Sequence, residues 1–311
     1  MLTESQDNFY MFDLPDSPRS LGDLVGLGFR LIRKNWKFVI SIFLVPSLIF
    51  SLAMAGVEFC FVHWAGAQSM DVNWFVIHMA AGFALAIIMI ACQWEIALRS
   101  CAYIRCVLNS EIAYEDCYAY ARRRQWPVMV VYGVSFLFPV LVLVVWMVLF
   151  LLTINLGKFG LIGKVLAIFF GFLEGLSFVA AFSFTMLYTA LCFVSISEAE
   201  VSAREALSNG YQLSISALPR GLSYVCLLAA SIFILTLPLY MPVILLGIWE
   251  GYVQGRMEDI QFPLYLRALE AASSCAINII SLGVALSGVT FYFRDVKMRR
   301  QGLDILEAMK R

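Results

Sequence analysis

Six long apolar stretches, separated by short polar segments, dominate the sequence and restrict the folds open to it. About 20 helical residues cross the roughly 30 Å hydrocarbon layer of a bilayer, whereas a membrane-spanning strand needs about ten residues of alternating polarity. A helix also satisfies its backbone hydrogen bonds within one segment, as lipid requires. We therefore predict an all-α, polytopic transmembrane helix bundle with six spans, near Phe38–Cys60, Trp74–Leu98, Pro127–Ile154, Lys164–Ser195, Leu222–Ile248 and Ala268–Phe293.

The composition points to the same class of protein. Hydrophobic residues make up 61% of the chain and charged residues 14%, and the net charge is zero. A soluble domain has about 25% charged residues to cover its surface. These values exclude a soluble globular enzyme and a disordered chain, and a neutral chain has no bulk field to attract nucleic acid. We expect the lipid bilayer as the main partner of the chain and no nucleic acid.

The placement of lysine and arginine predicts the orientation of the spans. Of the 22 basic residues, four lie in connections or span ends on one side of the predicted membrane: Lys158, Lys164, Arg256 and Arg267. The remaining basic residues flank the spans on the opposite side. Because basic residues accumulate on the cytoplasmic side, both termini are predicted to be cytoplasmic, which requires an even number of spans.

Three amphipathic segments precede the odd-numbered spans and suggest an internal repeat. They begin at Ser20, Ala113 and Ser202. Each has an acidic residue three positions after its start and a small residue at position eight; Ser202 and Glu205 form a capping-box pattern, and Ser20 with Asp23 is a close variant. A small residue would let the segment lie closely against a span. The acidic residues are Asp23, Asp116 and Glu205, and the small ones are Gly28, Ala121 and Gly210.

The repeat predicts the organisation of the whole chain. Each unit comprises one amphipathic helix, expected along the cytoplasmic interface, and two spans, so that the three copies are parallel rather than inverted. The units cover about residues 20–112, 113–201 and 202–300 of a single six-span domain. An acidic tail at residues 1–19 precedes this domain, and a short cytoplasmic tail at residues 301–311 follows it.

Three segments of the chain resemble a known family. SLGDLVGLGFRLIRKNWK follows the acidic tail, SISEAEVSAREALSNGYQLSISALPRG precedes the fifth span, and VTFYFRDVKMRRQGLDILEAMK ends the chain. They are similar to the glycerophosphoryl diester phosphodiesterase membrane domain family of six-span bacterial proteins. The matching positions are Glu205, Ala206, Leu207, Tyr292, Asp295, Arg299, Arg300, Gly302 and Asp304.

The resemblance implies a multi-pass protein of the bacterial cytoplasmic, or inner, membrane. The enzymatic barrel that gives the family its name is a separate domain, for which this chain has no room. The resemblance therefore does not imply phosphodiesterase activity, and the family's own membrane role gives no molecular mechanism.

Polar residues at membrane depth are the candidate functional residues, because ionisable groups are costly there. Glu174 and Asn278 each lie about ten residues into a span that starts on the same side, and at ~1.5 Å per residue they reach a similar depth. They could share a hydrogen bond in a proton or cation step, or could hold two helices together. Glu95 and Arg99 are four residues apart and predict a local ion pair at the end of the second span.

Three functions remain open at this point. The first is a non-catalytic scaffold or accessory subunit with a membrane-protein partner or a second copy of itself, because the loops are short and no soluble domain is present. The second is a transporter or channel for a small or amphipathic solute, because of Glu174, Asn278 and the two prolines in the fifth span. A membrane-embedded lipid enzyme is the third and weakest: we find no catalytic motif and no His or Cys cluster, and predict no enzyme, no cofactor and no metal.

Overall fold

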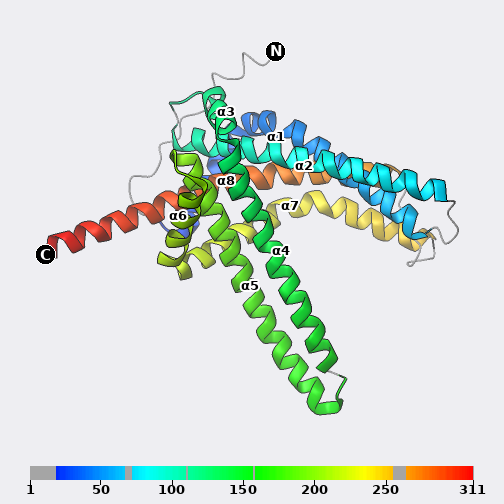
Figure 1. Cartoon of the computed structure of the whole chain (residues 1–311). Coiled ribbons are helices and arrows are strands. Elements are labelled where there is room, and N and C mark those ends of the chain that lie inside the picture. The colour runs from blue at the N-terminus through cyan, green and yellow to red at the C-terminus, as the bar shows by residue number, and fades with distance from the viewer. Residues whose placement is uncertain (1–18, 67–71, 110, 157, 255–263, 311) are drawn as a thin grey trace. The chain divides into compact units, whose positions relative to one another are not determined.

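In this computed structural model the described residues are 19–66, 72–109, 111–156, 158–254 and 264–310, and they contain eight helices and no strand (Figure 1). Six of these helices are long and apolar enough to cross a membrane, which confirms the predicted all-helical, six-span class. Residues 1–18, almost all of the predicted acidic tail, lie outside the described residues. The helices are α1 (Leu21–Gly66), α2 (Val72–Leu108), α3 (Tyr114–Arg123), α4 (Gln125–Leu156), α5 (Gly160–Glu198), α6 (Ala203–Ser216), α7 (Leu218–Gln254) and α8 (Leu264–Lys310).

All three predicted amphipathic segments are helical, and each is followed by two spans. The second and third segments form the separate helices α3 and α6, whereas the first is the beginning of α1. Within α1 the backbone leaves helical geometry at Asn35, with φ −113° and ψ 24°, before the span begins. The order of amphipathic helix, span and span therefore occurs three times along the chain.

A short break separates each amphipathic helix from the span that follows it. The breaks are at Asn35, at Arg124 between α3 and α4, and at Ala217 between α6 and α7. Asn35 and Ala217 have similar backbone angles, since Ala217 has φ −131° and ψ 34°. A break of this kind lets the chain change direction between the amphipathic helix and the span.

Side-chain caps fix where two of these helices begin. The hydroxyl of Ser202 accepts the backbone N–H of Glu205 at 3.2 Å, and the Glu205 carboxylate accepts the N–H of Ser202 at 2.8 Å. This is the predicted capping box, which satisfies two backbone donors that a helix N-terminus leaves free. At α1, Ser20 accepts the backbone N–H of Asp23 at 3.2 Å and donates its hydroxyl to the Asp23 carboxylate at 2.7 Å.

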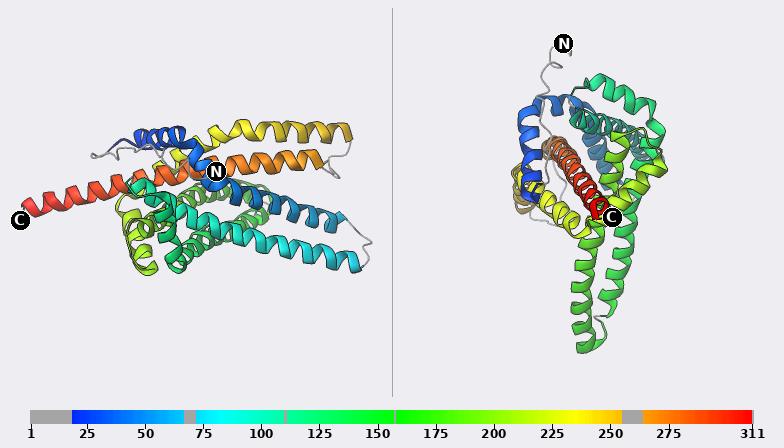
Figure 2. Two further views of the ribbon diagram at one scale, coloured as in Figure 1. Left: turned by 90° about the horizontal axis from the view of Figure 1, so that it is seen from above. Right: turned by 90° about the vertical axis from the view of Figure 1, so that its left-hand side faces the viewer.

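The helices form two compact units, each of which is described on its own. In its described residues the first unit contains Leu27–Tyr118 and Ala230–Ser287. In the two views of Figures 1 and 2, α1 lies beside α2, and the parts of α7 and α8 that belong to this unit also lie beside each other. Its mainly aliphatic core contains an aromatic pair, because the rings of Phe43 and Tyr103 lie 6.1 Å apart, and the Tyr103 hydroxyl is 2.7 Å from the hydroxyl of Ser287.

The second unit consists of Ala119–Ala229 and the described parts of Asp13–Gly26 and Gly288–Arg311. Its largest element is the hairpin of α4 and α5, which run antiparallel beside each other (Figures 1 and 2). Helix α6 packs against α5 at Gly210, where a Cβ atom would lie 2.3 Å from the sulfur of Cys192 and 2.9 Å from its backbone nitrogen. The small residue predicted at position eight of the third segment is thus required for this close approach.

Candidate functional site

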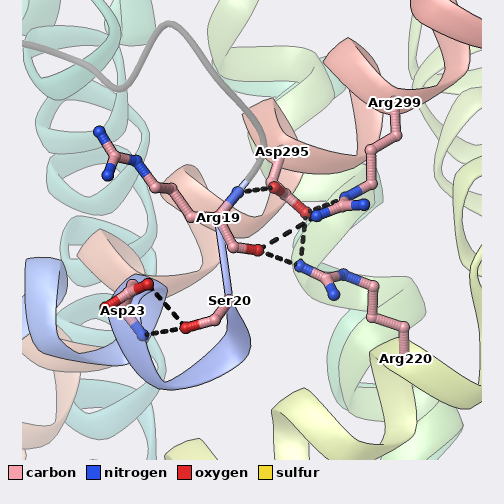
Figure 3. A network of polar contacts seen from close by, with 6 residues as sticks. All are labelled: Arg19, Ser20, Asp23, Arg220, Asp295 and Arg299. Atoms are coloured by element: carbon pink, nitrogen blue, oxygen red, sulfur yellow. Dashed lines mark hydrogen bonds and ion pairs between the residues drawn. The ribbon is translucent and has the colours of Figure 1, made fainter.

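The most extensive polar cluster of the second unit is centred on Asp295 of α8, whose side chain is fully buried (Figure 3). One carboxylate oxygen accepts the backbone N–H of Arg19 at 2.9 Å. The other accepts a guanidinium N–H from Arg220 at 3.0 Å and one from Arg299 at 2.9 Å. The same two guanidinium groups donate to the backbone carbonyl of Arg19, at 2.6 Å and 3.1 Å. These four residues make up the Asp295 cluster, in which Nε of Arg220 is buried without a hydrogen-bond partner among the described residues.

Three separate parts of the chain meet in the Asp295 cluster. Arg299 lies one helical turn after Asp295 on α8, at the spacing that favours a pair within one helix. Arg220 lies in the first turn of α7, and Arg19 immediately precedes the cap of α1. A buried carboxylate is stable only when its charge is paired and its lone pairs are hydrogen-bonded, and this arrangement meets both conditions.

Two stacked tyrosines lie on the same pair of helices. The rings of Tyr224 and Tyr292 are 4.5 Å apart and inclined by 13°, and both side chains are almost completely buried. A Cβ at Gly288 would lie 2.7 Å from the Tyr224 hydroxyl, and one at Gly221 would lie 3.0 Å from the Tyr292 hydroxyl. Each helix therefore contributes one glycine and one tyrosine to the crossing. Among the described residues, neither hydroxyl has a hydrogen-bond partner.

The predicted pair of Glu95 and Arg99 is present in the first unit. The Arg99 Nε donates to the Glu95 carboxylate at 2.7 Å, and the Tyr118 hydroxyl donates to the same oxygen at 2.8 Å. A second nitrogen of Arg99 donates to the backbone carbonyl of Ile42 in α1. Pro46 explains why that carbonyl is available, since proline has no N–H to bond the carbonyl four residues before it. The pair thus joins α2 to α1 and to the start of α3.

Glu174 lies inside the α4–α5 hairpin. One carboxylate oxygen accepts the hydroxyl of Thr153 on α4, and the backbone carbonyl of Glu174 accepts the indole N–H of Trp146 at 2.9 Å. The other carboxylate oxygen is buried and has no partner among the described residues. Asn278 belongs to the first unit and Glu174 to the second, so the predicted bond between these two side chains stays a prediction.

The sequence interpretation missed a further set of contacts at the end of α5. The Tyr120 hydroxyl donates to the carbonyls of Ile196 and Ala199, at 3.2 Å and 2.9 Å. Arg124 donates to the carbonyl of Ala199 at 3.0 Å and to that of Val201. Carbonyls at a helix C-terminus lack partners within the helix, so these side chains complete the end of α5. No local pattern predicts these contacts, because Tyr120 and Arg124 lie 75 to 79 positions before the residues whose carbonyls they bind.

An apolar pocket lies between α1 and α2, and the described residues contain no group of three or more His, Cys, Asp or Glu side chains arranged for a metal ion. The pocket has a volume of about 220 Å³, and it is lined by residues of α1 and α2: Val57, Cys60, His78, Met79, Gly82, Phe83 and Ala86. It therefore offers hydrocarbon contacts rather than a polar binding site.

The polar clusters, in contrast, act as ties between helices. Most of their donors and acceptors are directed at one another and at backbone groups of the same chain; Oε2 of Glu174 and Nε of Arg220 are the exceptions among the atoms named here. Comparison with models of protein families, with curated proteins and with solved structures finds no match to this chain.

Proposed function

We propose that this multi-pass membrane protein is a non-catalytic scaffold or accessory subunit, which binds a membrane-protein partner or a second copy of itself. In this proposal it belongs to the bacterial cytoplasmic membrane, with both termini on the cytoplasmic side, as its basic residues and its resemblance to a six-span family favour. The six apolar helices support the membrane part of this statement directly.

The observation that carries the proposal is the exposure of the α4–α5 hairpin. In the most apolar part of each helix, 6% of the α4 residues and none of the α5 residues are buried, compared with 39% for α1 and 50% for α8; α2 is as exposed as α4, with 6% buried. A helix that is apolar on every side must be covered by lipid or by other protein. Two adjacent spans whose apolar parts are this exposed leave several faces on which a partner helix can pack.

The ionisable side chains described above support the same proposal. Glu95 and Arg99 bind each other and a carbonyl of α1, Glu174 binds Thr153 within its hairpin, and Asp295 binds two arginines. A transport pathway needs polar groups that can exchange partners with a solute, whereas these groups hold helices in place. Their arrangement is typical of packing contacts in a membrane protein.

Photo-cross-linking in native membranes tests the proposal. A photoreactive amino acid would replace Ile168 or Phe172, whose side chains on α5 are 75% and 66% exposed. Phe83 on α2, 70% exposed, is the matched control position. We expect one protein adduct of constant mass from the α5 positions and lipid adducts from Phe83. Lipid adducts alone at both α5 positions, together with solute flux through the purified monomer in liposomes, would contradict the proposal.

A transporter or channel is the second candidate, and one observation favours it. The hydroxyls of Ser47 and Ser51 are buried in α1, four residues apart and directly after Pro46, and neither has a hydrogen-bond partner among the described residues. Unpaired hydroxyls inside a span could line a route for a polar solute. Replacing both serines by alanine would then reduce flux in liposomes, whereas a packing role predicts unchanged flux relative to the native protein.

A further inference from the structure

Two of the three junctions between an amphipathic helix and its span have the same exposed side chains. In the first, Arg33 and Lys34 directly precede the break at Asn35, and Trp36 follows it. In the second, two arginines directly precede the break and a tryptophan follows: Arg122 and Arg123 come before Arg124, and Trp126 comes after it. All four basic residues are exposed, and the two tryptophans are 53% and 71% exposed.

The helix before each break presents these cations on the face opposite its buried residues. Before the first break the exposed basic residues are Arg30, Arg33 and Lys34, a spacing that places them along one side of that helix, and Lys37 is exposed after the break. The buried residues of the same segment include Leu24 and Leu31. Between Phe29 and Phe38 the sequence contains no acidic residue, so the exposed side carries a concentrated positive charge.

The third junction differs and provides an internal comparison. Ile215 and Ser216 precede its break at Ala217, and no tryptophan follows. Its nearest basic residue, Arg220, is bound to Asp295 and to the carbonyl of Arg19. The third copy of the repeat therefore has the same backbone break without the exposed cations and indole.

We propose that the first and second junctions each bind the phosphodiester head group of one anionic phospholipid of the bilayer. Each junction lies where an amphipathic helix meets a span, which is the level of the lipid head groups. Arginine and lysine bind phosphate oxygens through charge-assisted hydrogen bonds, and the indole of tryptophan is stable at the boundary between head groups and hydrocarbon. The exposed cations match the charge of such a lipid, and the third junction binds none.

Native mass spectrometry of lipids retained by the protein tests this proposal. The protein would be reconstituted with equal amounts of phosphatidylglycerol and phosphatidylcholine and then released into mild detergent. We expect two retained phosphatidylglycerol molecules in the native protein and one each in Arg33→Gln/Lys34→Gln and Arg122→Gln/Arg123→Gln. The affinity of the altered junction should fall about fivefold for each cation removed, the ratio that corresponds to about 1 kcal/mol.

The matched control is Lys158→Gln/Lys164→Gln, which removes two exposed cations at the turn between α4 and α5, where no tryptophan follows. This variant should retain two phosphatidylglycerol molecules. Arg122→Lys/Arg123→Lys, which keeps the charge, should retain both lipids as well, and thus separates loss of binding from misfolding. Equal retention by all variants, an equal loss in the control, or displacement of the lipid by millimolar inorganic phosphate would overturn the proposal. None of these results would affect the scaffold proposal, which is tested by cross-linking through α5.

Discussion

Asp295 is a fully buried carboxylate that accepts three hydrogen bonds from distant parts of the chain and from its own helix. A fully buried carboxylate loses its hydration, and here two guanidinium groups and one backbone N–H replace the water. Arg220 and Arg299 keep 28% and 39% of their side chains exposed, so only one end of each ion pair is desolvated. The carboxylate therefore compensates two positive charges and also fixes the backbone that leads into α1.

Replacing Asp295 by alanine should destabilise the protein by about 2 kcal/mol. Removing one member of a fully buried ion pair costs about 3–5 kcal/mol, and the exposure of the two arginines reduces this value. Thermal unfolding in mild detergent is the measurement. Glu198→Gln is the control, because its 2.7 Å pair with Lys297 is partly exposed at both ends and is worth less than about 1 kcal/mol. Equal effects of the two substitutions would contradict the central role of Asp295.

At the scale of single elements, α1 shows how a proline can provide a contact between helices. Pro46 leaves the carbonyl of Ile42 without its usual donor, and Arg99 of α2 supplies one. Because the carboxylate of Glu95 also orients Arg99, this contact fixes the position of α1 and α2 along each other. A kink in a span is often interpreted as a hinge, but here the freed carbonyl is already occupied by a side chain.

A double-mutant cycle should show coupling between Pro46 and Arg99. Pro46→Ala restores the N–H that can bond to Ile42, so Arg99→Gln should then cost less than it does alone. We expect a coupling free energy of about 0.5–1.5 kcal/mol in unfolding measurements. The comparison cycle uses Pro139→Ala, since Pro139 lies in α4 and in the other unit, and the two changes should add within about 0.5 kcal/mol. Additivity in both cycles would mean that Arg99 does not replace the missing donor.

The capping box of α6 should make the beginning of this helix sensitive to acid. The backbone N–H of Ser202, and then its hydroxyl, lower the pKa of Glu205 below its ordinary value of 4.5. A carboxyl whose pKa is lower in the folded state stabilises that state above the ordinary pKa, and the contribution disappears as the pH falls through the folded-state pKa. Amide exchange in the first turn of α6 should therefore accelerate below pH 4.5 relative to intrinsic rates. Glu205→Gln should remove this dependence on pH.

The features that depend on neighbouring residues were predicted from the sequence, whereas the Asp295 cluster was not. Long apolar runs predict spans, the Ser202 and Glu205 pattern predicts a cap, and the spacing of Glu95 and Arg99 predicts their bond. By contrast, Asp295 meets partners 276 and 75 positions away, and no local rule relates such positions. The sequence names Asp295 only as one position of the motif that resembles a family, and that motif does not predict which residues contact Asp295.

At the scale of the whole molecule, the order of one amphipathic helix and two candidate spans occurs three times, and in the proposed topology each repeat returns the chain to the side from which it started. The repeats nevertheless differ in their polar chemistry, since the first two expose cations at their junctions and the third uses its arginine internally. The three repeats therefore share an order of helices, while their different side chains make different contacts. With six spans, we expect both ends of the chain to lie in one compartment.

Protease protection of terminal tags tests this topology. Tags on either end should be digested in inside-out vesicles and resist digestion in right-side-out vesicles, because most basic residues flank the spans on the side of the termini. A tag engineered at Lys158, between α4 and α5, should show the opposite behaviour. Digestion of the two terminal tags from opposite sides would require an odd number of spans and contradict the repeat.

The reciprocal contacts of Tyr224 with Gly288 and of Tyr292 with Gly221 restrict how this crossing can change during evolution. A methyl group at Gly288 would collide with the Tyr224 hydroxyl, whereas Tyr224→Phe removes that atom and the collision with it. Gly288→Ala alone should therefore lower the unfolding temperature, and Tyr224→Phe should restore part of the loss. We expect related sequences to change Gly288 and Tyr224 together, and Gly221 and Tyr292 together. Covariation between these positions would then reveal from sequences alone that α7 and α8 cross here.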